Sequence, residues 1–121
     1  MDLLLKRGQD AIEEEKYDIA IEHLTALVDH APDFTEAYDV RALAYYRMGL
    51  YGPALQDIGR VLEKNPQHFG ALAGMGAILE ELDQPEKALE IYRRVLEIHP
   101  HKPDVLKAVK RLEKVVEGMA L

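Results

Sequence analysis

A chain of 121 residues is long enough for one modest hydrophobic core, so we expect a single domain over residues 1–121. Its formal net charge of −7 argues against a nucleic-acid partner, because an acidic surface repels phosphate backbones. The absence of cysteine excludes disulfides, thiolate zinc sites and cysteine nucleophiles. No apolar run approaches the roughly 20 residues of a membrane-spanning helix, so no membrane insertion is expected.

Apolar residues recur at helical spacing along the whole chain, and proline or glycine separates the helical segments. Proline disfavours helix at the residue before it, and three segments end in front of Pro32, Pro66 and Pro100. Gly49 supplies a turn, and Pro53 lies in the first turn of the next helix, where its missing N–H costs nothing. The predicted helices cover about Leu4–Ile12, Tyr17–His30, Tyr38–Met48, Pro53–Lys64, Gly70–Leu82, Pro85–Ile98 and Val105–Glu117.

Residues of the same character recur at a fixed offset of 34 positions. A period of this size indicates stacked helix pairs, and it favours an extended binding surface over a catalytic pocket. The sets are Ala20, Ala54 and Ala88; Pro32, Pro66 and Pro100; Leu24, Ile58 and Tyr92; Leu27, Val61 and Val95; and Gly8, Ala42 and Gly76.

This pattern resembles the tetratricopeptide repeat, a helix-turn-helix unit of 34 residues. Small residues at the positions of Gly8 and Ala20 let the two helices of a unit touch. Pro85 departs from the pattern, because its position is normally aromatic, and the adjoining turn should differ slightly. The resemblance implies an all-α, right-handed α-solenoid of seven helices. Its parts are repeat 1 (1–34), repeat 2 (35–68), repeat 3 (69–102) and a capping helix (103–118).

Several short runs also resemble a narrower group of small exported proteobacterial tetratricopeptide proteins, for which no activity is defined. The runs are His30–Glu36, Arg41-Ala42, Asp57-Ile58, Pro66–Leu72 and Glu117-Gly118. Members of that group usually carry an export signal and a short segment before the first repeat, and neither is visible here. We therefore expect a periplasmic protein if an upstream signal was removed, and a cytoplasmic one otherwise.

The first helix of each repeat should line a concave groove, which resembling proteins use to bind peptides or protein segments. Its apolar floor and acidic rims would suit an extended or helical segment with apolar anchors and one or two basic residues. The alternative is that these are merely solvated helix faces, but exposed Leu and Tyr on such a face favour binding. The predicted groove residues are Leu5, Gln9, Ile12, Asp39, Leu43, Tyr46, Arg47, Gly70, Ala73, Gly74, Ala77 and Glu80.

Chaperone-binding members of the superfamily hold a partner's C-terminal carboxylate with Lys and Asn at fixed groove positions. The equivalent positions here hold Leu5, Gln9, Val40, Gly70 and Gly74. None of these is cationic, so we expect no carboxylate clamp. Gly70 and Gly74 either leave space for a ligand or allow close approach of the capping helix, and both interpretations stay open.

No residue pattern predicts catalysis, a cofactor or a metal site. The five histidines form no helical pair with metal-ligand spacing, and we interpret them as charge partners at helix ends, with His68-Phe69 packing between repeats 2 and 3. Glutamate runs such as Glu13–Glu15 are interpreted as solvated faces. We predict a non-enzymatic adaptor that binds a protein or peptide. The alternative is self-association through the apolar Leu3–Leu5 of a first repeat that has no N-terminal cap.

Overall fold

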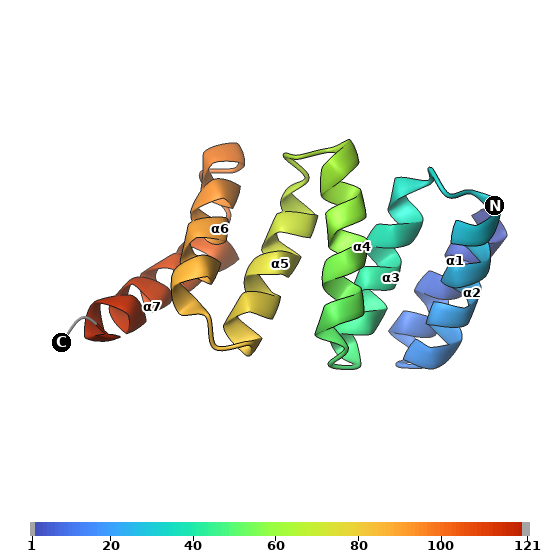
Figure 1. Cartoon of the computed structure of the whole chain (residues 1–121), viewed down its shortest axis with the longest axis horizontal. Helices are drawn as coiled ribbons and strands as arrows, with labels where there is room; N and C mark the ends of the chain where they lie inside the picture. The colour runs from blue at the N-terminus through green and yellow to red at the C-terminus, as the bar shows by residue number, and fades with distance from the viewer. Residues whose placement is uncertain (1, 120–121) are drawn as a thin grey trace. The chain divides into compact units, whose positions relative to one another are not determined.

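The computed structural model describes residues 2–119, which fold into seven helices without any strand (Figure 1). The predicted all-α class and helix-turn-helix order are confirmed, although α3 begins at Thr35 instead of Tyr38. None of the described helices combines the length and the apolar character that a membrane span needs. The helices are α1 (Asp2–Glu13), α2 (Tyr17–His30), α3 (Thr35–Arg47), α4 (Tyr51–Lys64), α5 (Phe69–Glu81), α6 (Pro85–Ile98) and α7 (Pro103–Met119).

The helices form two compact units, the first ending at Pro66 and the second beginning at Gln67. In the first unit α1 packs on α2, α2 on α3 and α3 on α4, and α1 also contacts α3. In the second unit α5 packs on α6 and α6 on α7. One domain over residues 1–121, with repeat boundaries after residues 34, 68 and 102, remains a prediction.

Two glycines let paired helices approach closely. A Cβ at Gly8 of α1 would lie 2.7 Å from Cγ of Leu24 in α2, and one at Gly76 of α5 would lie 2.8 Å from Cε1 of Tyr92 in α6. Leu24 is fully buried and Tyr92 is nearly so. The equivalent residue in the middle pair is Ala42, which is also buried. The prediction that small residues at these positions let the two helices of a unit touch is therefore confirmed.

The turn inside each helix pair places one residue in the left-handed region of backbone space. The three residues are Glu15 (φ 61°), Gly49 (φ 75°) and Asp83 (φ 57°), which are 34 positions apart. Each turn closes as a Schellman motif, in which an amide donates to the carbonyl five residues back. These bonds join Lys16 to Ala11 (2.8 Å), Leu50 to Tyr45 (2.9 Å) and Gln84 to Leu79 (2.9 Å).

Only Gly49 was predicted to supply such a turn, and the structure adds Glu15 and Asp83 in the same role. The expectation that Pro85 would alter the third turn is not met, because that turn keeps the bonding of the other two. Pro85 instead begins α6, where a helix needs no N–H donor.

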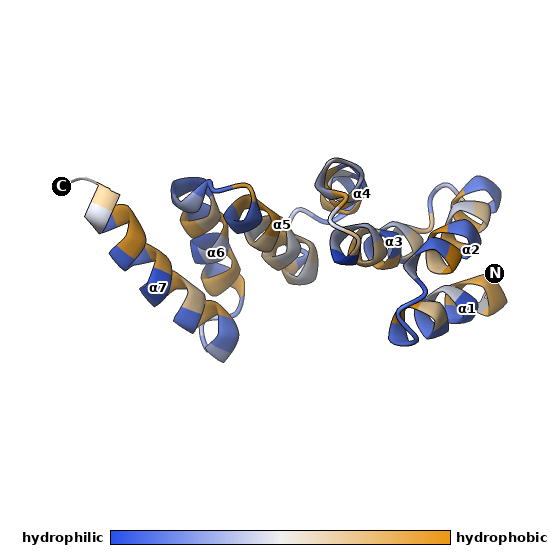
Figure 2. Ribbon diagram, turned by 90° about the horizontal axis from the view of Figure 1, so that it is seen from below, coloured by the Kyte–Doolittle hydropathy of each residue, from blue (hydrophilic) through white to orange (hydrophobic). Residues whose placement is uncertain are grey.

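The second unit ends with the amphipathic helix α7. Its buried residues pack in that unit, and Figure 2 shows hydrophobic and hydrophilic residues on different sides of α7. The helix was predicted over residues 103–118 and is observed over Pro103–Met119. The buried residues are Val105, Ala108, Val109 and Leu112.

The close helix contact predicts opposite effects for two glycine-to-alanine substitutions. Gly8→Ala should lower the free energy of unfolding by about 1–3 kcal/mol, because the new methyl would overlap the buried Leu24. Gly59→Ala, in the middle of α4 with no other group within 4 Å, should raise it by about 0.5–1 kcal/mol. Chemical denaturation of both variants measures the two values, and equal signs would contradict the role assigned to Gly8.

Candidate functional site

In the first unit, the predicted groove residues lie on α1 and α3, which contact each other. Leu43 has 40% of its surface exposed, so it offers apolar area to a ligand. The rest of this face mixes half-buried and polar exposed side chains. Gln9 and Arg47 are exposed, and Leu5, Asp39 and Tyr46 are half-buried.

Ile12 does not belong to this surface, which corrects one predicted groove residue. It is only 8% exposed and lies in a core cluster with Leu24 and Ala44. Leu5 and Val40 pack against the same cluster from its edge. The helical spacing placed Ile12 beside Gln9 on α1, but the contact between α1 and α3 covers it.

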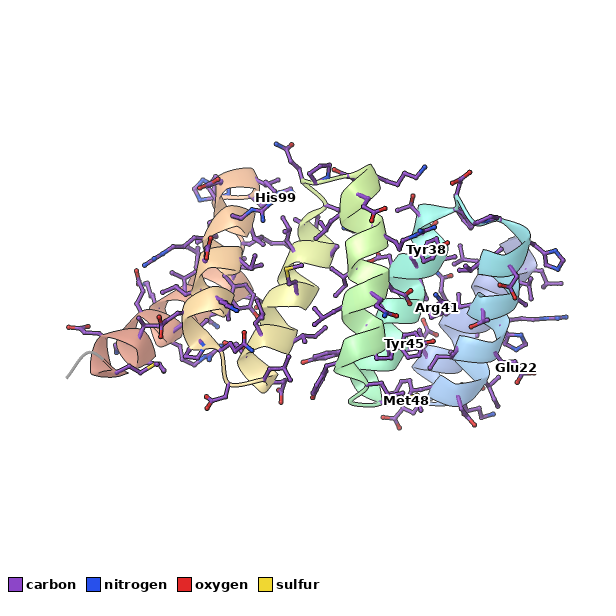
Figure 3. All side chains as sticks on the ribbon, in the orientation of Figure 1. Glu22, Tyr38, Arg41, Tyr45, Met48 and His99 are labelled. Carbon is purple, nitrogen blue, oxygen red and sulfur yellow. The ribbon has the colours of Figure 1, made fainter. Side chains whose placement is uncertain are left out.

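The apolar part of the first face continues into the turn between α3 and α4. Met48 and Leu50 are each 42% exposed, close to the value for Leu43. Met48 follows the last residue of α3 at this turn (Figure 3). The ring of Tyr46 lies 5.9 Å from that of Tyr51, tilted by 48°. We name Leu43, Tyr46, Met48, Leu50 and Tyr51 the apolar rim.

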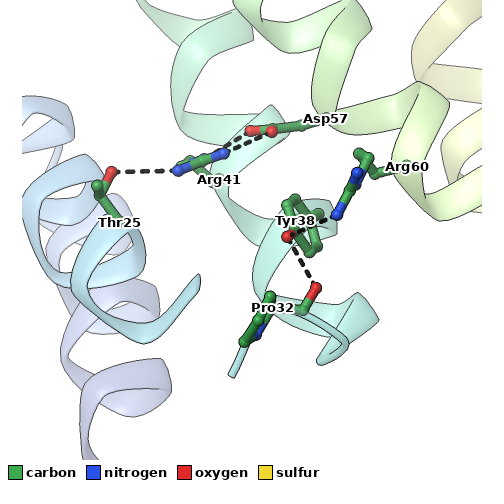
Figure 4. A network of polar contacts seen from close by, with 6 residues as sticks. All are labelled: Thr25, Pro32, Tyr38, Arg41, Asp57 and Arg60. Carbon is green, nitrogen blue, oxygen red and sulfur yellow. Dashed lines mark hydrogen bonds and ion pairs between the residues drawn. The ribbon is translucent and has the colours of Figure 1, made fainter. Parts of the chain in front are cut away.

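Helix α3 is fixed by a buried ion pair. Two guanidinium nitrogens of Arg41 each donate to a different carboxylate oxygen of Asp57 in α4, both at 2.8 Å (Figure 4). The third nitrogen donates to Oγ1 of Thr25 in α2 at 3.2 Å. The side chain of Asp57 is 4% exposed and that of Arg41 16%. One side chain therefore ties α3 to both neighbouring helices.

The hydrogen bonds to Asp57 raise the pKa of Arg41 above its ordinary value, and partial burial opposes the rise. Because the folded pKa lies above the unfolded one, the contribution of the Arg41 charge to stability is present at neutral pH and is lost as the pH rises through the folded pKa. Tyr38 donates to the carbonyl of Pro32 at 2.8 Å and accepts from Arg60 at 3.3 Å. These bonds tie the first turn of α3 to the segment before it and to α4.

The second unit presents the predicted face of α5, which is built from small residues. Gly70 is exposed, and Ala73, Gly74 and Ala77 are half-buried. A Cβ at Gly70 would meet only His68, at 3.2 Å, so close approach of α7 does not explain this glycine. The two interpretations of Gly74 stay open.

His68 caps α5, which gives it a role that the sequence did not predict. Its Nδ1 accepts from the amide of Ala71 at 3.0 Å. Phe69 was predicted to pack between repeats 2 and 3, and its recorded contacts lie within the second unit. Its ring centroid is 4.4 Å from that of His99, and Nζ of Lys102 lies 4.6 Å from the ring.

Glu80 was predicted as a groove acid, and the structure pairs it with a cation of α7. Its Oε1 lies 2.6 Å from Nη2 of Arg111, and its side chain is 22% exposed. The capping helix was predicted, but no groove positions were assigned to it. The signal was present, because the residues 34 positions after Ala73, Ala77 and Glu80 are Lys107, Arg111 and Lys114.

Acidic and histidine side chains are the candidate metal ligands of this chain, since it has no cysteine. Among residues 2–119, no three of them gather closely enough to hold an ion.

Comparisons with known proteins agree with the repeat geometry. A family model described as "Psidin, N-terminal TPR repeats region" matches residues 8–110. A TPR repeat-containing protein of Rhizobium etli is 33% identical over 118 residues, which are 98% of this chain and 58% of that protein. Hsp70-Hsp90 organizing protein 2 of Arabidopsis thaliana is 29% identical over 106 residues, or 88% of this chain and 19% of that protein. The chain thus spans less than two thirds of both relatives.

Solved structures show the same architecture. The first TPR domain of Spaghetti (RPAP3), bound to the HSP90 peptide SRMEEVD, matches with a TM-score of 0.89 at 26% identity. This match covers 95% of the present chain and 91% of the other. The first TPR domain of human RPAP3 gives a TM-score of 0.88, also at 26% identity, and covers 96% and 91% of the two chains.

Removing one partner of the buried pair should be costly. Asp57→Ala should lower the free energy of unfolding by about 2–4 kcal/mol, because Arg41 would keep its charge without a partner. Asp33→Ala provides the matched control, since the Asp33–Lys64 pair is exposed and should contribute little. Urea denaturation of the two variants measures the difference. Equal losses would show that the buried pair does not fix α3.

Proposed function

Because the chain belongs to the tetratricopeptide repeat family, we propose that it is a non-enzymatic adaptor that binds a peptide or protein segment along the first helices of its repeats. The observation that carries this proposal is the apolar rim. Leu43 of α3, and Met48 and Leu50 in the turn that follows it, are each about two-fifths exposed. A related domain, that of Spaghetti, was solved with a bound HSP90 peptide, which supports a peptide as the ligand class.

The rim favours recognition through apolar anchors in the first unit. Leu5 and Val40, which occupy two positions of the chaperone-type clamp, pack against the core cluster and carry no charge. Exposed apolar side chains next to polar ones can hold an anchor residue of an extended or helical segment. We therefore propose that the ligand of this unit is held by its side chains instead of by its C-terminal carboxylate.

The surroundings of the buried acid support an adaptor over an enzyme. Among the residues whose burial the structure describes, Asp57 is the one charged residue that is buried, and both of its carboxylate oxygens accept hydrogen bonds from Arg41. A general acid or base needs a reachable proton site close to its substrate. The paired Asp57 does not offer one.

A peptide-selection experiment tests the adaptor proposal. A library of acetylated, amidated peptides of 12 residues would be selected on the protein, and the affinities of recovered peptides measured by fluorescence anisotropy. Leu43→Ala should weaken binding by about tenfold or more, because a buried apolar anchor contributes at least this much. Combining it with Tyr46→Ala should weaken binding further.

Ile19→Ala is the matched control, because Ile19 of α2 is 41% exposed and equally apolar but lies outside the apolar rim. It should change affinity less than about twofold. Recovery of no binding peptide, or equal losses in both variants, would contradict the adaptor proposal.

Self-association is the alternative function, and Leu3 is the observation that favours it. Leu3 of α1 is 58% exposed, more than Leu43. If two copies cover this residue, light scattering should give a mass that rises with concentration, and Leu3→Glu should restore the monomer. A constant monomer mass from micromolar to millimolar concentration would remove this alternative.

A further inference from the structure

The groove positions of the repeat continue onto α7, where they carry positive charge. Counting 34 residues from Ala73, Ala77 and Glu80 of α5 leads to Lys107, Arg111 and Lys114. All three are exposed, and they lie at i, i+4 and i+7, which places them on one side of a helix. The buried residues of α7 lie on the opposite side of the helix. We name Lys107, Arg111 and Lys114 the cationic row.

The contact between Arg111 and Glu80 places this row next to the predicted face of α5. Nη2 of Arg111 lies 2.6 Å from Oε1 of Glu80, the groove residue nearest the end of α5. The side chain of Arg111 remains 58% exposed despite this pair. The Arg111–Glu80 pair therefore brings the end of the groove face of α5 and the cationic row of α7 together within the second unit.

Most of the positive charge of the row is not neutralised inside the protein. No ion pair is recorded for Lys107 or Lys114 within residues 2–119. Glu113 of α7 pairs with Arg93 of α6 at 3.0 Å, away from the row. The excess of acidic over basic residues is also smaller in this half of the sequence. Residues 67–121 hold 9 Asp and Glu and 8 Lys and Arg, whereas residues 1–66 hold 13 and 7. An anion approaching the row meets far less repulsion than it would at the first unit.

The neighbouring face of α5 carries only short side chains at four groove positions, so a ligand backbone would meet no bulky side chain there. Gly70, Ala73, Gly74 and Ala77 carry no side chain longer than a methyl group. Lys107 and Lys114 are separated by about 10 Å along the helix axis, at 1.5 Å per residue. A segment in the extended polyproline II conformation rises about 3.1 Å per residue and completes one turn in three residues, so it covers about 9 Å while side chains three residues apart point the same way. Carboxylates spaced three residues apart would then match the two lysines.

We propose that the surface formed by α5 and the cationic row binds an internal acidic segment of a partner protein in extended form. This inference rests on the proposed adaptor function and names the ligand class for the second unit. The row lies on α7, outside the clamp positions considered in the sequence, so a free C-terminal carboxylate is not required. Arg111 would exchange part of its contact with Glu80 for a carboxylate of the ligand.

A pair of synthetic peptides tests the proposal. One is acetylated, amidated and carries Glu at every third position, and the other replaces each Glu with Gln. Fluorescence anisotropy with the whole chain, at low and at physiological salt, should show binding of the Glu peptide and at least about tenfold weaker binding of the Gln peptide. Absence of measurable binding of the Glu peptide at low salt would overturn the proposal.

Charge reversal identifies the surface that binds. Lys107→Glu combined with Lys114→Glu should weaken binding of the Glu peptide by about tenfold or more. The matched control combines Lys87→Glu with Arg94→Glu, which makes the same charge change at exposed residues of α6. It should cost less than about threefold. Equal losses of affinity in the two double variants would mean that net charge alone explains the effect, and this would overturn the proposed site.

A third variant should change affinity in the opposite direction. Glu80→Gln releases Arg111 from its ion pair and should tighten binding of the Glu peptide by about two- to fivefold. Unchanged or weaker binding would contradict the part assigned to Arg111. If library peptides lose affinity with Leu43→Ala but the Glu and Gln peptides bind alike, this inference fails while the adaptor proposal stands. If no peptide binds at all, both fail.

Discussion

Close contact between the two helices of a pair is the constraint on which the rest of the structure depends. At Gly8 and Gly76 a single added carbon would lie less than 3 Å from a buried side chain of the partner helix. The helices can approach this closely only along one side, where Ala20 and Ala88 are fully buried. When that side packs against the partner helix, another side of the first helix in each pair remains uncovered. The candidate binding surfaces on α3 and α5 follow from this division of each helix into a packed and an open side.

The ion pair of Arg41 and Asp57 fixes the rotation of α3 about its own axis. This helix buries three alanines and Tyr38 and exposes Leu43, so apolar burial constrains its rotation less than in a helix with a continuous row of large apolar residues. A bidentate guanidinium–carboxylate contact has a fixed geometry and tolerates no such rotation. The pair therefore contributes more to the orientation of the helix than to net stability, since the loss of hydration offsets much of its attraction. The consequence for function is that the apolar rim is held at a defined place.

The 34-residue period predicted what depends on local pattern: helix order, the small contact residues and the prolines that follow α2, α4 and α6. The period did not predict the features that depend on contacts between helices or on the energy of the backbone conformation. Glu15 and Asp83 adopt a conformation that favours glycine, because the Schellman bonds outweigh a strain of about 1–2 kcal/mol. Ile12 is buried by residues of neighbouring helices, and the spacing of residues within one helix does not predict where those helices lie. The cationic row was missed for another reason: α7 was read as a cap alone, although the same period extends through it.

The two candidate surfaces differ in the forces that they can use. The apolar rim gains free energy from the removal of hydrocarbon from water, which added salt does not weaken. The cationic row gains it from exposed charges, which salt screens over about 8–10 Å. A ligand with an apolar anchor would therefore keep its affinity for the rim as ionic strength rises, while an acidic segment would leave the row. The overall charge of −7 repels acidic ligands from most of the surface. An acidic segment would therefore bind specifically at the cationic row, where the local charge is positive.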